Sequence, residues 1–295
     1  MRTYQSLSGS RNFLYEIQNQ SWKGEVHSTF KQTINIKCES GKLYTIATAE
    51  LDNAPNTLRV TDFFNNRPRV SEKTPVFSRN GQLVIGSIAT IEAQSASEWQ
   101  YPKVEFPRKQ EYSRITERLK QLEQWLNHLE SKGGYLLNQT QATAYEKMIH
   151  RMLQKESAQL LIYLKEKQLF QARQQLNRVI GLGPGLTPSG DDFLVGLALI
   201  FTTVNYPYHS LKQWLYNSRD ELKKRTNIIS FSTLDWAIKG VSRERIGSFL
   251  NELFSGEDEE LLKEKMLAVL AIGSTSGGDM LTGMLAGIKL TLDLL

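Results

Sequence analysis

The period of the hydrophobic pattern changes once along this chain of 295 residues, and that change constrains the fold most strongly. Between residues 26 and about 98, short runs of apolar residues alternate with polar ones; Ile34 and Ile36, for example, flank Asn35. A period of two is typical of β-strands with one buried face. Beyond residue 107 the apolar residues recur every three or four positions, which is the spacing of amphipathic helices.

Turn signals divide the alternating region into short strands. Asn80-Gly81 lies between two apolar runs, at residues 75–77 and 83–85, and an Asn-Gly pair readily adopts the positive φ angles of a type I′ hairpin turn. Four or more such strands within about 75 residues indicate a small antiparallel β-barrel or sandwich. We therefore expect an α+β protein, with a β-rich domain over residues 1–105 and an all-helical domain over residues 106–295.

The second region should contain a series of helices. Its first apolar stripe runs from Ile115 to Leu129 with alternating steps of four and three residues, and Gly133-Gly134 ends it. Further helical patterns cover residues 140–155, 158–180, 191–204, 210–225, 228–239, 259–271 and 279–292. No comparable strand pattern occurs in this region, which favours a purely helical domain.

One short motif occurs twice in the helical region. Residues 189–196 (SGDDFLVG) align without gaps to residues 276–283 (SGGDMLTG), so the two copies share the pattern S-G-x-D-x-L-x-G. Small hydroxyl residues lie just upstream of each copy, Thr187 before the first and Ser274 before the second, and an apolar helical pattern follows each. We interpret the motif as an internal duplication of a glycine-rich loop-helix element.

The duplicated element predicts two closely packed helices with both N-termini at one end. Gly196 and Gly283 lie four residues after the shared aspartates, on the same helix face, and a flat glycine face lets helix axes approach. Two adjacent helix N-termini offer unpaired N–H donors and partial positive charge to an anion. The candidate substrate-binding residues of these loops are Gly185, Thr187, Ser189, Gly190, Ser274, Ser276 and Gly277.

Acidic residues at the same loops add a second kind of chemistry. Asp191, Asp192 and Asp279 lie in segments without any Lys or Arg, at residues 179–211 and 266–288. Three carboxylates suit a divalent metal such as Mg²⁺, a substrate nitrogen or a base. We take all three as candidate metal ligands, and Asp192 and Asp279 also as candidate catalytic groups. The alternative is that these carboxylates only cap their helices.

The β-rich domain supplies three further candidates. His27, beside Ser28 on the first strong strand, could act as a catalytic acid or base, or could be a strand-edge residue that faces water. Asn53 and Asn56 flank Ala54-Pro55 in a turn, where their amides could hold a substrate oxyanion or could merely shape the turn. The sequence leaves both pairs of alternatives open.

Composition and charge narrow the range of protein classes. The net charge is +5, with basic and acidic residues mixed along the chain, which favours a solvated surface over a nucleic-acid-binding patch. The longest apolar run, residues 193–204, is shorter than the roughly 20 residues of a membrane span. Cys38 has no partner for an internal disulfide, and residues 1–14 lack the apolar stretch of a signal peptide. We expect a cytoplasmic protein that binds neither membrane nor nucleic acid.

The run GLGPGLTPSGDD at residues 181–192 resembles one bacterial family closely. This family, long described as a domain of unknown function, includes the H subunit of the oxamate carbamoyltransferase of allantoin degradation. Further similarity lies at residues 26–28, 53–56, 226–230 and 273–283. The chain departs from the family pattern at residues 275–279, TSGGD, where the family has a more hydroxyl-rich version with a single glycine.

The resemblance implies a transferase subunit of purine catabolism. The implied enzyme transfers a carbamoyl group between oxalurate and phosphate, giving oxamate and carbamoyl phosphate, and contains two other kinds of subunit as partners. The expected ligands are therefore small anions, namely phosphate, carbamoyl phosphate and oxalurate. The resemblance does not imply that this chain is active alone. A regulatory or assembly subunit that binds a small metabolite without catalysing its reaction is the alternative.

Overall fold

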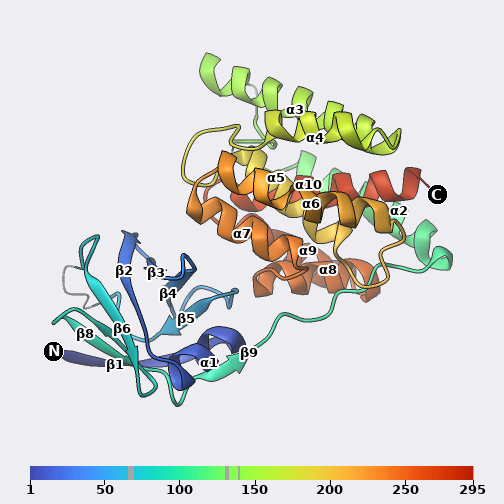
Figure 1. The fold of residues 1–295 in the computed structure, drawn as a ribbon. Coiled ribbons are helices and arrows are strands. Elements are labelled where there is room, and N and C mark those ends of the chain that lie inside the picture. Colours follow the sequence, from blue (N-terminus) through green and yellow to red (C-terminus); the bar gives the residue numbers. More distant parts are fainter. Residues whose placement is uncertain (66–69, 130–132, 139, 295) are drawn as a thin grey trace. The chain divides into compact units, whose positions relative to one another are not determined.

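The computed structural model describes residues 1–65, 70–129, 133–138 and 140–294, and the chain divides into two compact units, Met1–Pro102 and Lys103–Leu295 (Figure 1). Each unit is described by itself. The elements of the first unit are β1 (Arg2–Ser10), α1 (Arg11–Asn19), β2 (Trp22–Thr29), β3 (Thr33–Cys38), β4 (Leu43–Thr48), β5 (Thr57–Val60), β6 (Pro75–Arg79), β7 (Gln82–Ile85), β8 (Ala89–Glu92) and β9 (Ser97–Trp99).

Among the described residues, eight strands of the first unit close into a barrel. Their order is β5-β4-β3-β2-β6-β7-β8-β1, and pairing of β1 with β5 completes the ring. The α+β fold with an N-terminal barrel is therefore confirmed. The pairing is mixed, however, because β1 runs parallel to β8 and β9, and β4 runs parallel to β5. Hairpin turns enforce antiparallel neighbours, whereas strands joined by longer connections are free to pair in parallel.

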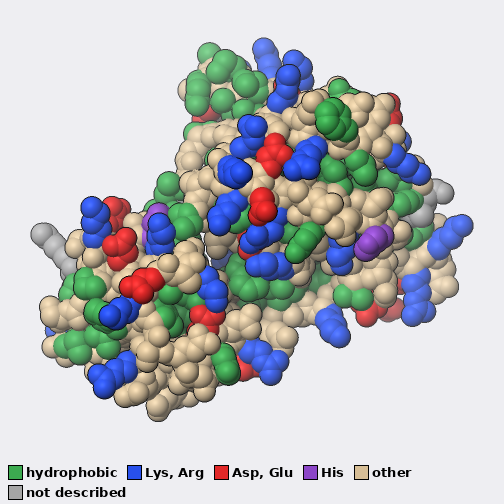
Figure 2. Space-filling view, in the orientation of Figure 1, with side chains coloured by type: hydrophobic (Ala, Val, Ile, Leu, Met, Phe, Trp, Pro, Cys, Tyr) green, Lys and Arg blue, Asp and Glu red, His purple; other side chains and the backbone are tan. Residues whose placement is uncertain are grey.

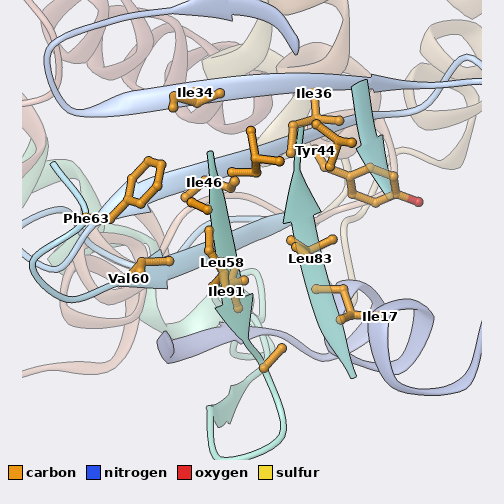
Figure 3. Close-up of a cluster of buried hydrophobic side chains, with 14 of the residues drawn as sticks. Ile17, Ile34, Ile36, Tyr44, Ile46, Leu58, Val60, Phe63, Leu83 and Ile91 are labelled. Atoms are coloured by element: carbon orange, nitrogen blue, oxygen red, sulfur yellow. The ribbon is translucent and has the colours of Figure 1, made fainter. Parts of the chain in front are cut away.

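Apolar side chains from all around the ring fill the barrel (Figure 3). Ile34, Ile46, Leu58 and Ile91 are completely buried there, and each occupies the inward position of an alternating strand. The sequence analysis did not foresee α1, which adds Ile17 to the same core. Burial of one such side chain stabilises the fold by about 1.5–3 kcal/mol, so this cluster holds the ring together.

The second unit is helical throughout its described residues. Its elements are a short 3₁₀ helix η1 (Lys109–Glu111), α2 (Tyr112–Asn127), α3 (Ala144–Lys165), α4 (Leu169–Val179), α5 (Ser189–Phe201), α6 (His209–Arg225), α7 (Ile228–Ile238), α8 (Glu244–Ser255), α9 (Glu259–Leu270) and α10 (Ser276–Asp293). The structure differs from the expected helices at two points. Helix α3 continues through residues 155–158 and the chain turns instead at Lys167, where φ is 58°, and α8 was not expected.

Helix α5 is the most deeply buried element of the helical unit. Each of its residues is buried, including Asp191 and Asp192, and its apolar side chains face all directions, as expected of a central helix. Helices α4, α6, α7 and α10 surround it (Figure 1). The duplicated motif therefore begins a helix in the interior of the unit, so the polar groups at that helix start need partners within the protein or from a ligand.

The described helices include none with the length and apolar character required to cross a bilayer. In the face shown in Figure 2, Lys and Arg side chains are dispersed, and Asp and Glu side chains lie between them. Positive and negative side chains are therefore interspersed on this face, as they are along the sequence.

Candidate functional site

Helices α5 and α10 pack at backbone contact through the glycines of the duplicated motif. A Cβ atom on Gly196 would lie 2.0 Å from the carbonyl oxygen of Met280, and one on Gly283 would lie 2.0 Å from the carbonyl oxygen of Phe193. Phe193 and Met280 occupy the same position of the two copies, so the contact is reciprocal. No side chain larger than hydrogen fits at either glycine without displacing a backbone.

The similarity between the copies extends to the helices that precede them. A Cβ on Gly190 would lie 2.0 Å from the carbonyl oxygen of Val179, at the end of α4, and one on Gly277 would lie 2.0 Å from that of Val269, near the end of α9. The repeated unit in the structure is therefore a helix, a tight loop and a second helix. Glycine at these two positions allows each loop to turn directly against the preceding helix end.

The two loops are anchored alike but differ in length. The amide of Gly190 donates to the carbonyl of Leu182, eight residues earlier, at 2.8 Å, and the amide of Gly277 donates to the carbonyl of Ile272, five residues earlier, at 3.0 Å. Both glycine N–H groups are therefore engaged within the protein. The first loop has three extra residues in its exposed part, which includes Gly185 with a φ of 92°.

The first acidic residue of the motif stabilises its own loop. The buried carboxylate of Asp191 accepts hydrogen bonds from the amide of Gly181 at 2.5 Å, from the hydroxyl of Ser230 at 2.6 Å and from the hydroxyl of Thr226. Both carboxylate oxygens thus have protein donors. As a candidate metal ligand, Asp191 would have to exchange these bonds for a metal bond.

The aspartate that both copies share, Asp192 in the first and Asp279 in the second, lies in a different environment from that of Asp191. Burial raises the pKa of Asp279 to about 6, although the Tyr135 amide, which donates to Oδ1 at 2.7 Å, lowers it, as do the hydroxyls of Ser189 and Thr275. The backbone donor comes from the segment that follows α2, outside the duplicated motif.

Among the described residues, no backbone N–H group donates to the carboxyl of Asp192. Burial raises the pKa of Asp192 well above its usual range, and the neighbouring carboxylates of Asp279 and Asp191 raise it further. The hydroxyls of Ser276 and Thr187 act in the opposite direction. The carboxyl of Asp192 is therefore protonated over a wider pH range than an exposed aspartate.

The two copies exchange hydroxyl and carboxyl partners in a crossed arrangement. Ser276 of the second copy interacts with Asp192 of the first, and Ser189 of the first copy interacts with Asp279 of the second. The hydroxyl of Thr187 lies 3.1 Å from that of Ser276 and links the loops directly. The structure therefore brings together Thr187, Ser189, Asp192, Ser276 and Asp279, five of the residues predicted from the sequence.

Each member of the carboxyl pair retains one unsatisfied oxygen. The Oδ2 atoms of Asp192 and Asp279 are buried and form no hydrogen bond with the described part of the protein. Neither helix is capped by a side chain, because the N-cap residues Pro188 and Thr275 form no such bond. Capping therefore does not explain the shared aspartates, and a proton or a ligand would satisfy their open oxygens.

Exposure differs among the remaining loop residues. Ser274 and Gly185 are exposed, Thr187 and Ser276 are half-buried, and Ser189 is buried. Hydroxyl groups thus lead from the loop surface toward the buried carboxyl pair. No group of three or more His, Cys, Asp or Glu side chains within residues 1–65, 70–129, 133–138 and 140–294 forms a metal-binding cluster.

The β-unit candidates take part in local hydrogen bonds. Nδ1 of His27, on β2, lies 3.2 Å from the hydroxyl of Ser28. Asn53 accepts a hydrogen bond from the hydroxyl of Ser8 at 2.7 Å, and Asn56, with a φ of 51°, donates to a backbone carbonyl at 3.1 Å. An acid–base role for His27 and a substrate-binding role for the two asparagines stay predictions.

Sequence reasoning missed the segment that supplies the backbone donor to Asp279. A Cβ on Gly134 would lie 2.1 Å from Oδ1 of Asp279, so only glycine allows this approach, and its carbonyl lies 2.8 Å from Nδ1 of His150 on α3. The ring of Tyr135 stacks on that of Phe193 at 4.8 Å. Gly133-Gly134 was interpreted only as a helix end; the doubled glycine was the available signal.

Two protein-family models match parts of this chain. Residues 5–98 match the AllH family N-terminal domain, and residues 179–288 match oxamate carbamoyltransferase subunit AllH. No solved structure matches the chain. The first match includes most of the barrel, and the second includes both loops and the contact between α5 and α10. Since the two matches together cover more than half of the sequence, the chain belongs to the AllH family of oxamate carbamoyltransferase subunits.

Proposed function

We propose that this chain is the oxamate carbamoyltransferase subunit that binds a small anionic substrate at the paired loops, residues 185–192 and 274–279. Membership of the AllH family supports a role as a subunit that acts with other subunits. The observation that carries the proposal is the crossed pair of Asp192 and Asp279, each with a buried oxygen that lacks a partner among the described residues.

An anion can bind beside this acidic pair because a protonated carboxyl carries no negative charge. Burial raises the pKa of Asp192, which favours the protonated carboxyl, and in that form the group adds no negative charge. A protonated carboxyl donates a hydrogen bond, as do the hydroxyls of Thr187 and Ser276. The N-termini of α5 and α10 add partial positive charge at the same end. Together these groups can bind phosphate or a carboxylate.

Asp279 supplies the complementary group. With a pKa of about 6 it is ionised at neutral pH, so its unsatisfied oxygen accepts a hydrogen bond. Oxalurate and carbamoyl phosphate both carry an amide nitrogen beside oxyanions. One donor carboxyl and one acceptor carboxylate match such a ligand, in which N–H groups lie next to negatively charged oxygens.

These roles lead to a balanced transfer step. A phosphate oxygen bonds to the carbamoyl carbon of oxalurate, and the bond from that carbon to the oxamate nitrogen breaks. Asp192 gives its proton to the departing nitrogen and regains one from the attacking hydrogen phosphate. The products are oxamate and carbamoyl phosphate. The helix N-termini and hydroxyls stabilise the negative charge that develops on the carbamoyl oxygen.

A role for Mg²⁺ is the part of the proposal that depends on Asp279. Among the three predicted ligands, only Asp192 and Asp279 have an oxygen without a hydrogen-bond partner in the described part of the chain, and a protonated Asp192 would first have to lose its proton. Mg²⁺ would therefore take most of its ligands from water and phosphate oxygens. We expect Mg²⁺, if it binds, to do so together with the phosphate-bearing ligand.

Calorimetric titration of the full chain with phosphate, carbamoyl phosphate and oxalurate, with and without Mg²⁺, tests the proposal. We expect Asp192→Ala to weaken binding at least tenfold, or about 1.4 kcal/mol, whereas Asp192→Asn, which keeps a neutral donor, changes it less than threefold. Asp220→Asn, at an exposed carboxylate of α6, is the matched control and should leave binding unchanged.

Two results would contradict the proposed site. Equal affinities of wild type and Asp192→Ala would show that the ligand does not bind at the paired loops. Absence of binding heat for all three ligands, combined with stable capture of the other subunits, would favour the alternative of a regulatory or assembly subunit. Loss of binding in Asp192→Asn as well as in Asp192→Ala would require an ionised carboxylate, and hence a metal or an ammonium group, in place of the donor that we assign.

A further inference from the structure

A polar cluster surrounds Arg59 on the outer face of the barrel. Leu58 and Val60 point into the core, so the intervening Arg59 of β5 points outward. Its Nη1 donates to the hydroxyl of Ser8 at 3.1 Å, and its Nη2 donates to the carbonyl of Ala49 at 2.5 Å. The guanidinium thus lies between β1 and the loop that connects β4 to β5.

Uncharged polar groups continue from this point across the same face. Strand β4 pairs with β5 in parallel, with Thr45 opposite Thr57 and Ala47 opposite Arg59. The hydroxyl of Thr45 donates to Oδ1 of Asn35 at 2.9 Å. The side-chain amide of Asn35 in turn donates to the hydroxyl of Ser28, on β2, at 3.1 Å. Nδ1 of His27 lies 3.2 Å from the same hydroxyl. These residues form a row of donors and acceptors without a carboxylate.

The guanidinium itself is incompletely satisfied. Nε of Arg59 is buried and has no hydrogen-bond partner in the described part of the chain. The described residues also include no carboxylate that forms an ion pair with Arg59. A buried charged donor without an acceptor destabilises the folded protein, because it loses its hydrogen bonds to water.

We propose that Arg59 is a binding residue for a small oxyanion, whose oxygen accepts the hydrogen bond of the unpaired Nε–H. The guanidinium presents Nε and a neighbouring Nη side by side, a spacing that matches the two oxygens of a carboxylate. Phosphate offers the same pair of oxygens in tetrahedral geometry. Ser8 and Asn53, which bond to each other at 2.7 Å, hold the guanidinium in register with the strand.

This site goes beyond the proposed function because it belongs to the β unit and is independent of the carboxyl pair. The planar carboxylate of oxamate is the ligand that we favour, since side-on binding by Nε and Nη matches a planar group with two oxygens. The family to which the chain belongs is named for oxamate, which makes oxamate a suitable probe.

The test is a titration of the full chain with potassium oxamate and, separately, with inorganic phosphate at equal ionic strength. The readout is the ¹⁵N–¹H signal of the Arg59 Nε–H group, assigned from its loss in Arg59→Lys. We expect oxamate to shift this signal saturably and Arg59→Lys to weaken calorimetric binding at least tenfold. Lys37→Gln, which removes an exposed charge from the same outer face of β3, should change affinity less than twofold.

The possible results separate this site from the paired loops. A signal that does not move with either anion overturns the proposal, and so does a loss of affinity that is equal in Arg59→Gln and Lys37→Gln, because net charge would then explain it. Saturation by phosphate alone, with the same dependence on Arg59, supports the oxyanion site and identifies phosphate as its ligand. In Asp192→Ala the Arg59 signal should shift as in wild type, whether or not the paired loops bind a substrate.

Discussion

The two copies of the loop-helix element share a sequence pattern but differ in what covers them. In the first copy, Asp191 accepts bonds from the hydroxyls of Thr226 and Ser230, at the start of α7. The second copy has Gly278 at that position, and a Cβ there would lie 2.8 Å from the side chain of Leu136. One copy is thus covered by hydroxyls and the other by an apolar side chain.

The difference extends to the aspartates that both copies share. Asp279 receives the Tyr135 amide, which moderates the rise of its pKa, whereas burial and two nearby carboxylates raise the pKa of Asp192 without such a donor. Duplication thus sets the geometry of the helix pair, whereas the unrelated segments around it determine which donors lower the pKa of each shared carboxyl.

The largest expected effect concerns what the copies have in common, their glycine contact. We expect Gly196→Ala and Gly283→Ala each to lower the free energy of unfolding by more than about 3 kcal/mol, because the new Cβ would lie 2.0 Å from a carbonyl oxygen of the facing helix. Urea denaturation followed by circular dichroism measures this loss.

The matched control for these substitutions is Gly287→Ala, in α10. Its Cβ would approach only the side chains of Ile200 and Leu197, at 3.1–3.2 Å, which can shift by a few tenths of an ångström. It should cost about 1 kcal/mol. Equal losses at Gly287 and Gly283 would mean that backbone contact between the copies is not what requires glycine at position 283, because helix propensity by itself favours alanine.

The next effect is the pH dependence that the carboxyl pair confers. The pKa of Asp279 rises from 3.8 to about 6 on folding, so the folded state holds this proton more tightly than the unfolded state. Its contribution to stability is complete below pH 3.8 and is lost as pH rises through about 6, a total of about 3 kcal/mol. Urea denaturation of wild type and Asp279→Asn between pH 4 and 7 isolates this contribution.

We expect the difference in stability between wild type and Asp279→Asn to change by about 1.4 kcal/mol per pH unit inside that window. Asp192→Asn should remove a loss in the same direction, since burial raises the pKa of Asp192 well above that of an ordinary aspartate. A pH-independent difference for both variants would show that neither carboxyl holds a proton in the folded state.

The smallest effect concerns the acid that only the first copy has. We expect Asp191→Ala to lower the free energy of unfolding by about 2 kcal/mol, because the amide of Gly181 and the hydroxyls of Thr226 and Ser230 lose their common acceptor. Thermal unfolding monitors the change. Asp258→Ala, which removes an exposed helix cap on α9, should cost about 1 kcal/mol, and a smaller loss for Asp191→Ala would contradict its loop-stabilising role.

Local patterns in the sequence sufficed to predict the barrel, the helical region and the residues of the paired loops. Alternation of apolar residues predicts strands, and the Asn80-Gly81 turn joins β6 to β7 as its type requires, with φ angles of 52° and 78°. The recurrence of S-G-x-D-x-L-x-G predicts that Asp192 and Asp279 lie close together. These features depend on neighbours within a few residues, which a single sequence contains.

The remaining features depend on contacts between distant segments. The parallel pairing of β1 with β8 joins residues about 87 positions apart, and no local signal sets their direction. The donor to Asp279 comes from Tyr135, 144 residues away in the chain. Arg59 likewise gains its significance only from an unpaired atom, Nε, that no sequence pattern reveals.

The position of β1 within the ring has a consequence for synthesis on the ribosome. This strand is made before the other seven of the barrel, yet it pairs with β5 on one side and with β8 on the other. The edge that pairs with β8 stays available to other strands until Glu92 has left the exit tunnel. Cotranslational closure of the ring is therefore a late event, and a pause in translation before that residue would prolong the period in which the emerging chain can aggregate.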